Sequence, residues 1–253
     1  LAVDEITHVV STTCTNSSNP GFDVFLAQEP NRNWVLPSLH GVGVRQRSCG
    51  SVPCRESVLL VSCHLAQRNC PALVAACEIT SSMRRDELER ISRDQEIRIG
   101  VTLFRDGASA LIPSFNPEGG VFPKLSKGIY ELVNWMHLTV PDTHSDLRID
   151  VDASGFKATL SAYILSLTAP LLLRSCTTLP NKSAMPTLPS EPQDFDWAVH
   201  PEGAVILSAI QTAMNINKDE MKAIWEVYEN DRNTSSVTVL SVLDTLRMQP
   251  GRE

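Results

Sequence analysis

The sequence predicts an α/β fold built from two consecutive halves. Short apolar segments rich in β-branched residues alternate with segments whose apolar residues recur at helical spacing, which is typical of α/β proteins. Near the middle of the 253-residue chain, Asn116–Gly120 concentrates Asn, Pro and Gly, the residues that mark turns and linkers. We therefore place a domain boundary there, with residues 1–116 forming the first half and residues 121–253 the second.

In the first half, two segments rich in apolar and β-branched residues are expected to be strands, Glu5–Thr15 and Ala72–Ile79. Two helices are predicted, one at Phe22–Gln28 and one at the charged segment Met83–Asp94.

A hairpin is predicted immediately after these elements. Asp106-Gly107 is a typical hairpin turn, so the segments on either side of it, Ile99–Phe104 and Ala108–Pro113, are expected to pair with each other.

The second half is expected to begin with a strand at Tyr130–His137 and a loop at Pro141–Thr143. Residues 175–193 contain four prolines and many Ser and Thr residues, so they are predicted to form a surface loop.

Three helices are then expected, at Gly203–Met214, after Asn217, and at Thr234–Arg247. Asn217 followed three residues later by Glu220 is the pattern of a capping box, which marks the start of the second helix.

Composition and charge argue against several classes of protein. The net charge is −7 with both signs interspersed, so no basic surface for nucleic acid is expected. The longest apolar run, around Leu160–Leu173, is broken by Ser, Thr and Pro, so no membrane span is expected. Seven cysteines without a secretory signal indicate reduced thiols and a cytoplasmic location. Five of them lie close together but lack a CxxC spacing, so no metal site is expected.

Two polar residues near the C-terminus form the candidate site. His200 lies in Asp194–Gly203 at a predicted tight turn, and Asn233 lies about thirty residues later at the mouth of a predicted helix. Both side chains can donate hydrogen bonds to an enolate or oxyanion, which suits chemistry at a carbonyl group. The alternative is a core histidine and an ordinary N-capping asparagine.

The wording of these two segments, Trp197-Ala-Val-His-Pro-x-Gly and Asn233-x-Ser-Ser-Val-Thr-Val-Leu, resembles the chalcone synthase-like type III polyketide synthases, especially their fungal members. Similar segments occur along most of the chain: Cys14–Asp23, Leu39–Gly43, Ala76–Ile79, Leu103–Ala110 and Ile129–Leu132. The chain departs from the family pattern at Glu202, where a second glycine is usual, and at Arg105, where a small residue is usual.

The resemblance implies a thiolase-like fold of two pseudo-equivalent halves in αβαβα layers, incomplete at both ends here, and a homodimer. It also implies an acyltransferase that condenses malonyl-CoA with an acyl-CoA starter by a decarboxylative Claisen reaction, giving pyrones or phenolic products. The matching His200 and Asn233 would stabilise the enolate, and no metal or redox cofactor is implied beyond the coenzyme A thioesters. Phe156 lies where the family often has a pocket-lining aromatic residue, with plain core packing as the alternative.

The nucleophile is the main departure from the family. In similar fungal enzymes the catalytic cysteine directly follows the Leu39–Gly43 motif, but this chain has Val44 there, and residues 44–70 match poorly. One hypothesis is a reading-frame error, because a one-base shift can turn this stretch into Cys followed by Gly-Leu-Ala-Ala. Others are that Cys49 or Cys54 acts as the nucleophile, that the chain is a catalytically dead remnant or pseudoenzyme, and that it is another thiolase-fold ketoacyl synthase.

Overall fold

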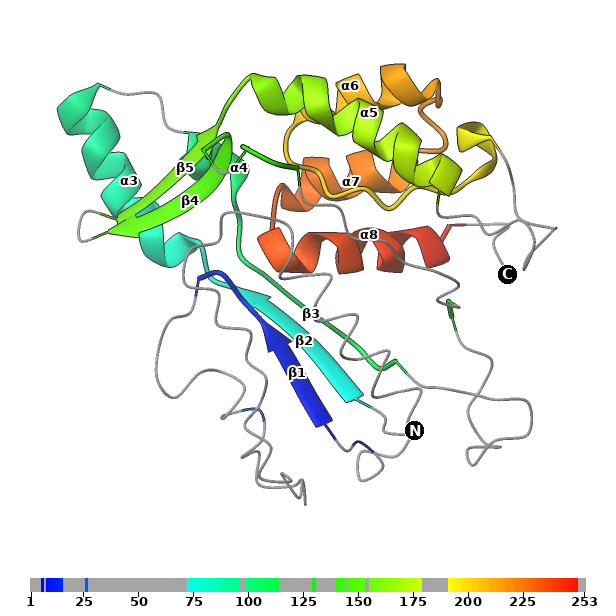
Figure 1. Ribbon diagram of the computed structural model, residues 1–253. Helices are drawn as coiled ribbons and strands as arrows, with labels where there is room; N and C mark the ends of the chain where they lie inside the picture. The colour runs from blue at the N-terminus through cyan, green and yellow to red at the C-terminus, as the bar shows by residue number, and fades with distance from the viewer. Residues whose placement is uncertain are drawn as a thin grey trace.

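The computed structural model describes residues 6, 8–15, 26, 72–95, 99–113, 129–130, 140–143, 145–152, 155–178 and 191–249 (Figure 1). The predicted elements at Phe22–Gln28 and Tyr130–His137 lie outside these residues, apart from Leu26 and Tyr130, and so does the predicted boundary at Asn116–Gly120.

The described residues of the predicted first half form a three-stranded sheet. Its order is β1 (His8–Thr12), β2 (Ala72–Glu78) and β3 (Gly107–Leu111), with β2 in the middle. β1 runs parallel to β2, and β3 runs antiparallel to it. Five of the seven residues of β2 are buried, as expected for a central strand with both faces covered. The two strands predicted around β1 and β2 are therefore confirmed.

The predicted hairpin at Asp106-Gly107 is wrong. Ile99–Leu103 forms a short helix, α4, and β3 pairs with β2 instead. Gly100 and Leu103 are both buried, and their i, i+3 spacing places them on one helix face. Five residues are too few to distinguish this helical spacing from a strand pattern by sequence.

Asp106 anchors a helix instead of turning a hairpin. The predicted charged helix is confirmed as α3, Ser81–Asp94. At its first turn, the Asp106 carboxylate accepts a hydrogen bond from the Ser81 backbone N–H at 2.7 Å and another from the Ser81 hydroxyl. A carboxylate from a distant segment thus satisfies a donor that the start of a helix leaves without an intrahelical partner.

In the described part of the second half, β4 (Leu147–Asp152) and β5 (Gly155–Leu160) form a two-stranded antiparallel sheet. It continues into α5, Tyr163–Thr178, which contains Pro170. The predicted start of the surface loop at residue 175 is wrong, because α5 extends to Thr178 and packs against the following helix. A 3₁₀ turn, η2 (Pro192–Asp194), precedes the C-terminal helices.

The three predicted C-terminal helices are confirmed: α6 (Ala204–Met214), α7 (Lys222–Asp231), and α8 (Thr238–Arg247) with the 3₁₀ turn η3 (Ser235–Val237) before it. Their apolar faces enclose the larger buried cluster of the described residues, which comprises Ile206, Leu207, Ile210, Met214, Ile216, Met221, Ala223, Ile224, Val227, Val242 and Leu246.

The capping box is also confirmed. Glu220 accepts the Asn217 N–H at 2.6 Å, and Asn217 accepts the Glu220 N–H at 3.3 Å, on the turn that leads into α7.

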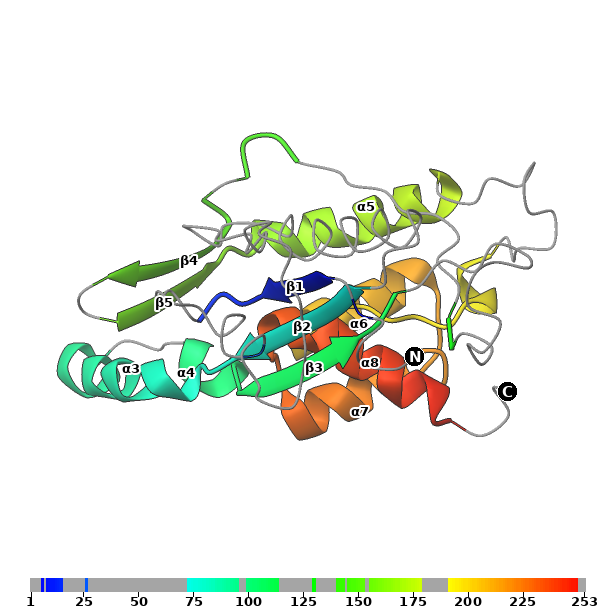
Figure 2. The ribbon, with the colours of Figure 1, turned by 90° about the horizontal axis from the view of Figure 1, so that it is seen from below.

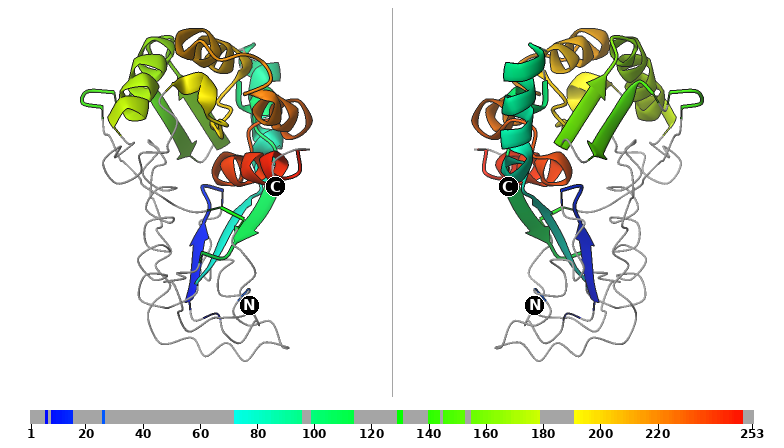
Figure 3. Two further views of the ribbon diagram at one scale, coloured as in Figure 1. Left: turned by 90° about the vertical axis from the view of Figure 1, so that its right-hand side faces the viewer. Right: turned by 90° about the vertical axis from the view of Figure 1, so that its left-hand side faces the viewer.

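The C-terminal helices lie over one end of the three-stranded sheet (Figures 1 and 2). Figure 3 shows the sheet below α8, and β3 packs against α8. The turn η3 packs against β2, so the start of α8 meets the sheet near its central strand. This packing brings Asn233–Ser236 to the place where β1 and β2 end.

Candidate active site

A buried carboxylate, that of Glu78, organises this junction. Glu78, the last residue of β2, is 1% exposed and accepts hydrogen bonds from two segments. From the end of β1 it accepts the Cys14 N–H at 3.0 Å and the hydroxyls of Thr13 at 3.2 Å and Thr15 at 3.0 Å. From η3 it accepts the Ser236 N–H at 3.3 Å and the Ser236 hydroxyl.

The sequence explains why these groups meet. The carboxyl ends of adjacent parallel strands lie at one edge of a sheet, so the residues after β1 and the last residue of β2 are neighbours. A carboxylate this deeply buried needs several donors to offset its lost hydration. The Thr- and Ser-rich segments on either side of Glu78 supply them, and they tie the sheet to the start of α8.

Asn233 is held by its backbone and oriented by its side chain. Its N–H donates to the Leu103 carbonyl at 3.1 Å, and its carbonyl accepts the Arg105 N–H at 3.0 Å. The residue is 3% exposed. The side-chain oxygen accepts the Ser235 N–H at 2.8 Å. Because that bond uses the amide oxygen, the NH₂ group faces the other way and is the part of Asn233 that can donate to a substrate oxygen.

The turn after Asn233 is locked in an uncommon conformation. Ser235 has a φ of 53°, in the left-handed region that non-glycine residues rarely adopt. Three contacts hold it there: Thr238 accepts the Thr234 N–H at 2.9 Å, the Thr238 hydroxyl donates to the Ser235 carbonyl at 3.1 Å, and the Ser235 hydroxyl lies 3.1 Å from the Cys14 sulfur. Such strain is commonly maintained at functional sites.

His200 lies on the loop between η2 and α6. Trp197 fixes this loop by donating its indole N–H to the Pro192 carbonyl at 2.8 Å and by packing on the C-terminal core. A tight turn follows, in which the Glu202 N–H donates to the His200 carbonyl at 3.0 Å. Gly203 ends the turn with a φ of 149°, which favours glycine. The imidazole is 13% exposed, and its Nε2 lies 3.8 Å from Oε1 of Glu202.

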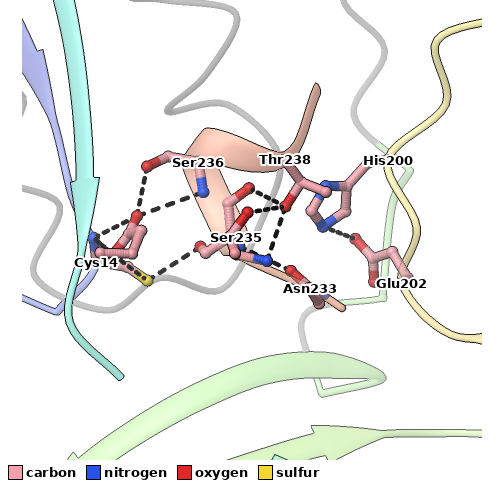
Figure 4. A network of polar contacts seen from close by, with 9 residues as sticks. Cys14, His200, Glu202, Asn233, Ser235, Ser236 and Thr238 are labelled. Carbon is pink, nitrogen blue, oxygen red and sulfur yellow. Dashed lines mark hydrogen bonds and ion pairs between the residues drawn. The ribbon is translucent and has the colours of Figure 1, made fainter. Parts of the chain in front are cut away.

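His200 lies in the same group of polar residues as Asn233, Ser235 and Thr238 (Figure 4). The roles predicted for His200 and Asn233 stay predictions, and the bond from Ser235 to Asn233 also fits the capping role given as the alternative. Val44 and residues 44–70 lie outside the described residues. Phe156 lies in β5 opposite Val151 of β4, and its predicted pocket-lining role stays a prediction.

Comparison with known proteins identifies the family. A family model described as chalcone and stilbene synthases, C-terminal domain, matches residues 131–253. A fungal type III polyketide synthase of known crystal structure, ORAS, is 37% identical in sequence to this chain, and the two structures align with a TM-score of 0.79. The alignment covers 100% of this chain and 68% of that chain. The chain belongs to the type III polyketide synthases.

Other members agree with this assignment. A type III pentaketide synthase from Neurospora crassa is also 37% identical over 100% of this chain and 68% of its own, with a TM-score of 0.78. The acylalkylpyrone synthase csyB of Aspergillus oryzae is 32% identical over 96% of this chain. The chain spans 62% of the length of that relative. The expectation of a thiolase-like α/β fold is thereby confirmed. The comparisons also favour a type III polyketide synthase over the alternative of another thiolase-fold ketoacyl synthase.

Sequence reasoning missed the network around Glu78. Its members Cys14, Glu78 and Ser236 all belong to segments that carry the family resemblance, but nothing local links them. The sequence could have predicted this network from the positions of its polar residues, because polar residues at the ends of two buried parallel strands are expected to meet at one edge of the sheet. The approach of Glu202 to His200 was also missed, although its departure from the family pattern was visible.

Two ionisable groups near the junction are perturbed. Burial raises the pKa of the Cys77 thiol, and the charges of Glu78 and Asp106 raise it further. This thiol is therefore protonated at neutral pH and poorly reactive, unlike a catalytic cysteine. The hydrogen bond from the Ser81 hydroxyl is the main cause that lowers the pKa of Asp106.

No helix in the part of the chain that the structure describes is long and apolar enough to cross a membrane.

Proposed function

We propose that this chain performs the central reaction of a type III polyketide synthase, the decarboxylative Claisen condensation of malonyl-CoA onto an acyl-CoA starter. The observation that carries the proposal is the orientation of Asn233, whose amide oxygen is engaged by Ser235 so that its NH₂ is presented as a donor. His200 lies in the same cluster and supplies a second donor (Figure 4). Two preorganised donors suit an oxygen that gains negative charge during reaction.

The residues act on the malonyl thioester. Loss of carbon dioxide leaves the electron pair of the broken C–C bond on the α-carbon and, by resonance, on the thioester oxygen. His200 and Asn233 donate hydrogen bonds to that oxygen and stabilise the enolate. The α-carbon then attacks the carbonyl of the acyl thioester, and the thiolate leaves. Repeated condensation and cyclisation give pyrones or phenolic rings.

Relatives support the substrates and the product class. The csyB relative is an acylalkylpyrone synthase, and a structure of CsyB contains CoA-SH. The proposed reaction oxidises and reduces nothing, so we expect it to need no metal or redox cofactor. We further propose that the synthase works in the cytoplasm and that it is a homodimer. Light scattering of the purified protein would test the homodimer.

A second candidate is a catalytically dead remnant, and Val44 is the observation that favours it. Valine has no nucleophilic atom and cannot hold an acyl group as a thioester. Sequencing the transcript across the codons for Gly41 to Cys77 separates the candidates. A cysteine directly after Gly43 in a continuous frame supports the synthase, whereas Val44 as written supports the remnant.

Intact-mass analysis gives the matching chemical test. After incubation with an acyl-CoA starter, a chain with cysteine at this position is expected to gain the mass of one acyl group. A chain with Val44 is expected to keep its mass. An acyl group found on Cys49 or Cys54 would overturn the remnant and assign a new nucleophile.

A further inference from the structure

Glu202 is placed beside His200 by the backbone. The turn from Glu202 N–H to the His200 carbonyl, closed by Gly203, holds the two side chains on the same loop. Oε1 of Glu202 lies 3.8 Å from Nε2 of His200, and the two side chains are 27% and 13% exposed. Most water is thus excluded from the pair, and partly buried charges are screened less than exposed ones.

The other described side chains drawn around the imidazole are neutral. Of the labelled side chains near it, Asn233 and Thr238 are uncharged, and Ser235 points away toward Cys14 (Figure 4). The ionisable groups that the network adds from β1 and β2 are Cys14 and Glu78. Glu78 already accepts hydrogen bonds from both segments around it. Glu202 forms a charge pair with His200 when the imidazole is protonated.

The separation of 3.8 Å matters for what Glu202 can do. It lies outside hydrogen-bond range, so the carboxylate does not take up the Nε2–H as an acceptor. It still lies close enough for its charge to favour the protonated imidazole. A charged donor forms a stronger hydrogen bond to an oxyanion than a neutral one, so a protonated His200 would stabilise the enolate oxygen more strongly than a neutral His200.

We propose that Glu202 is a positioning residue that holds His200 as an imidazolium facing the enolate oxygen. The use of that imidazolium rests on the proposed function, but the pairing itself does not. Type III synthases usually have glycine at this position, so the proposal concerns a property of this chain.

The pairing is tested without substrate by a pH titration of the histidine ring signals in NMR spectra. His200→Asn identifies the His200 signal by its loss. In Glu202→Gln, which keeps the side-chain size and removes the charge, the His200 midpoint is expected to fall by about one pH unit. Glu202→Asp is expected to retain part of the shift, because it restores the charge.

Glu89→Gln is the matched control. It removes the same charge from an exposed pair with Arg85 on α3, and it is expected to leave the His200 midpoint unchanged. Equal midpoints in the unmodified chain and in Glu202→Gln would overturn the proposal, and so would equal shifts in Glu202→Gln and Glu89→Gln. If Glu202→Gln does not fold, Glu202→Gly, which carries the usual family residue, removes the same charge and takes its place.

Turnover distinguishes this proposal from the proposed function. In a condensing preparation, Glu202→Gln is expected to lower kcat about tenfold, less than the complete loss of one oxyanion donor. KM is expected to change by less than about twofold, because the stronger hydrogen bond forms to the enolate and not to the bound ester. A midpoint shift without condensation in any variant would contradict the proposed function and leave the pairing in place.

Discussion

Replacing Glu78 with alanine tests the buried network that joins the ends of β1 and β2 to η3. The carboxylate accepts the N–H groups of Cys14 and Ser236 and the Ser236 hydroxyl. Alanine cannot accept any of these bonds, and the side chain it replaces is 1% exposed, so water reaches the vacated donors poorly.

The magnitude follows from the donors that lose their acceptor. Each buried donor left unsatisfied costs about 1–3 kcal/mol, and the two N–H groups together give roughly 2–6 kcal/mol. Removing the carboxylate also removes the cost of burying its charge, which offsets part of that loss. We expect Glu78→Ala to lower the free energy of unfolding by about 3 kcal/mol, a large share of the ~5–15 kcal/mol typical of a domain.

Urea unfolding followed by circular dichroism measures this loss. Glu89→Ala is the matched control, because its exposed pair with Arg85 is worth at most about 0.5 kcal/mol. A double-mutant cycle with Ser236→Ala is expected to give a coupling energy of about 1–3 kcal/mol. A Glu78→Ala protein that loses no more stability than Glu89→Ala would contradict this role of Glu78.

Three other changes test separate contacts. Asp106→Ala is expected to cost about 1 kcal/mol by removing the acceptor for the Ser81 N–H. The pKa of Asp106 is lowered in the folded protein. Its contribution to stability is therefore present above the unfolded carboxyl pKa and is lost as pH falls through the folded pKa. In urea melts, the difference in free energy of unfolding between the unmodified protein and Asp106→Ala should narrow from about pH 7 to about pH 2. Gly107→Ala would place a Cβ 2.9 Å from Cβ of Thr234 and should cost about 1–3 kcal/mol in the same assay. Cys77, whose pKa is raised mainly by burial, should react with iodoacetamide more slowly than a peptide cysteine at neutral pH, as measured by mass spectrometry.

Elements whose signal is local were predictable from the sequence. The capping box of Asn217 and Glu220 is complete within four residues, and both of its hydrogen bonds form. The helical faces of α6 and α8 each span about three turns, which is long enough for their period to be recognised.

Elements decided by tertiary contacts were not predictable. Asp106-Gly107 has the composition of a hairpin turn, but Ser81 engages the aspartate and β2 provides a better partner for β3. The Ser- and Thr-rich end of α5 reads as a loop, but its helix packs along α6 and continues to Thr178. In both cases packing overrides the local preference.

The candidate site divides in the same way. His200 and Asn233 lie in short sequence motifs that resemble those of the family, so they could be identified from the sequence alone. The hydrogen bond that Ser235 donates to Asn233 spans two residues, whereas those that Cys14 and Ser236 donate to Glu78 span 64 and 158. Only the folded arrangement of sheet and helix brings the latter together. The orientation of the Asn233 amide likewise required the Ser235 contact.

The most direct test of the account is product formation from malonyl-CoA and a panel of acyl-CoA starters, followed by liquid chromatography and mass spectrometry. The protein is expressed in the reading frame that the transcript defines. We expect pyrones or phenolic products, a loss of at least about 100-fold in Asn233→Ala, and little change in Asn217→Ala, which removes an asparagine from the exposed capping box. Equal product from Asn233→Ala and the unmodified protein would contradict the role given to this site. The absence of product from a protein that carries cysteine after Gly43 would contradict the proposed function itself.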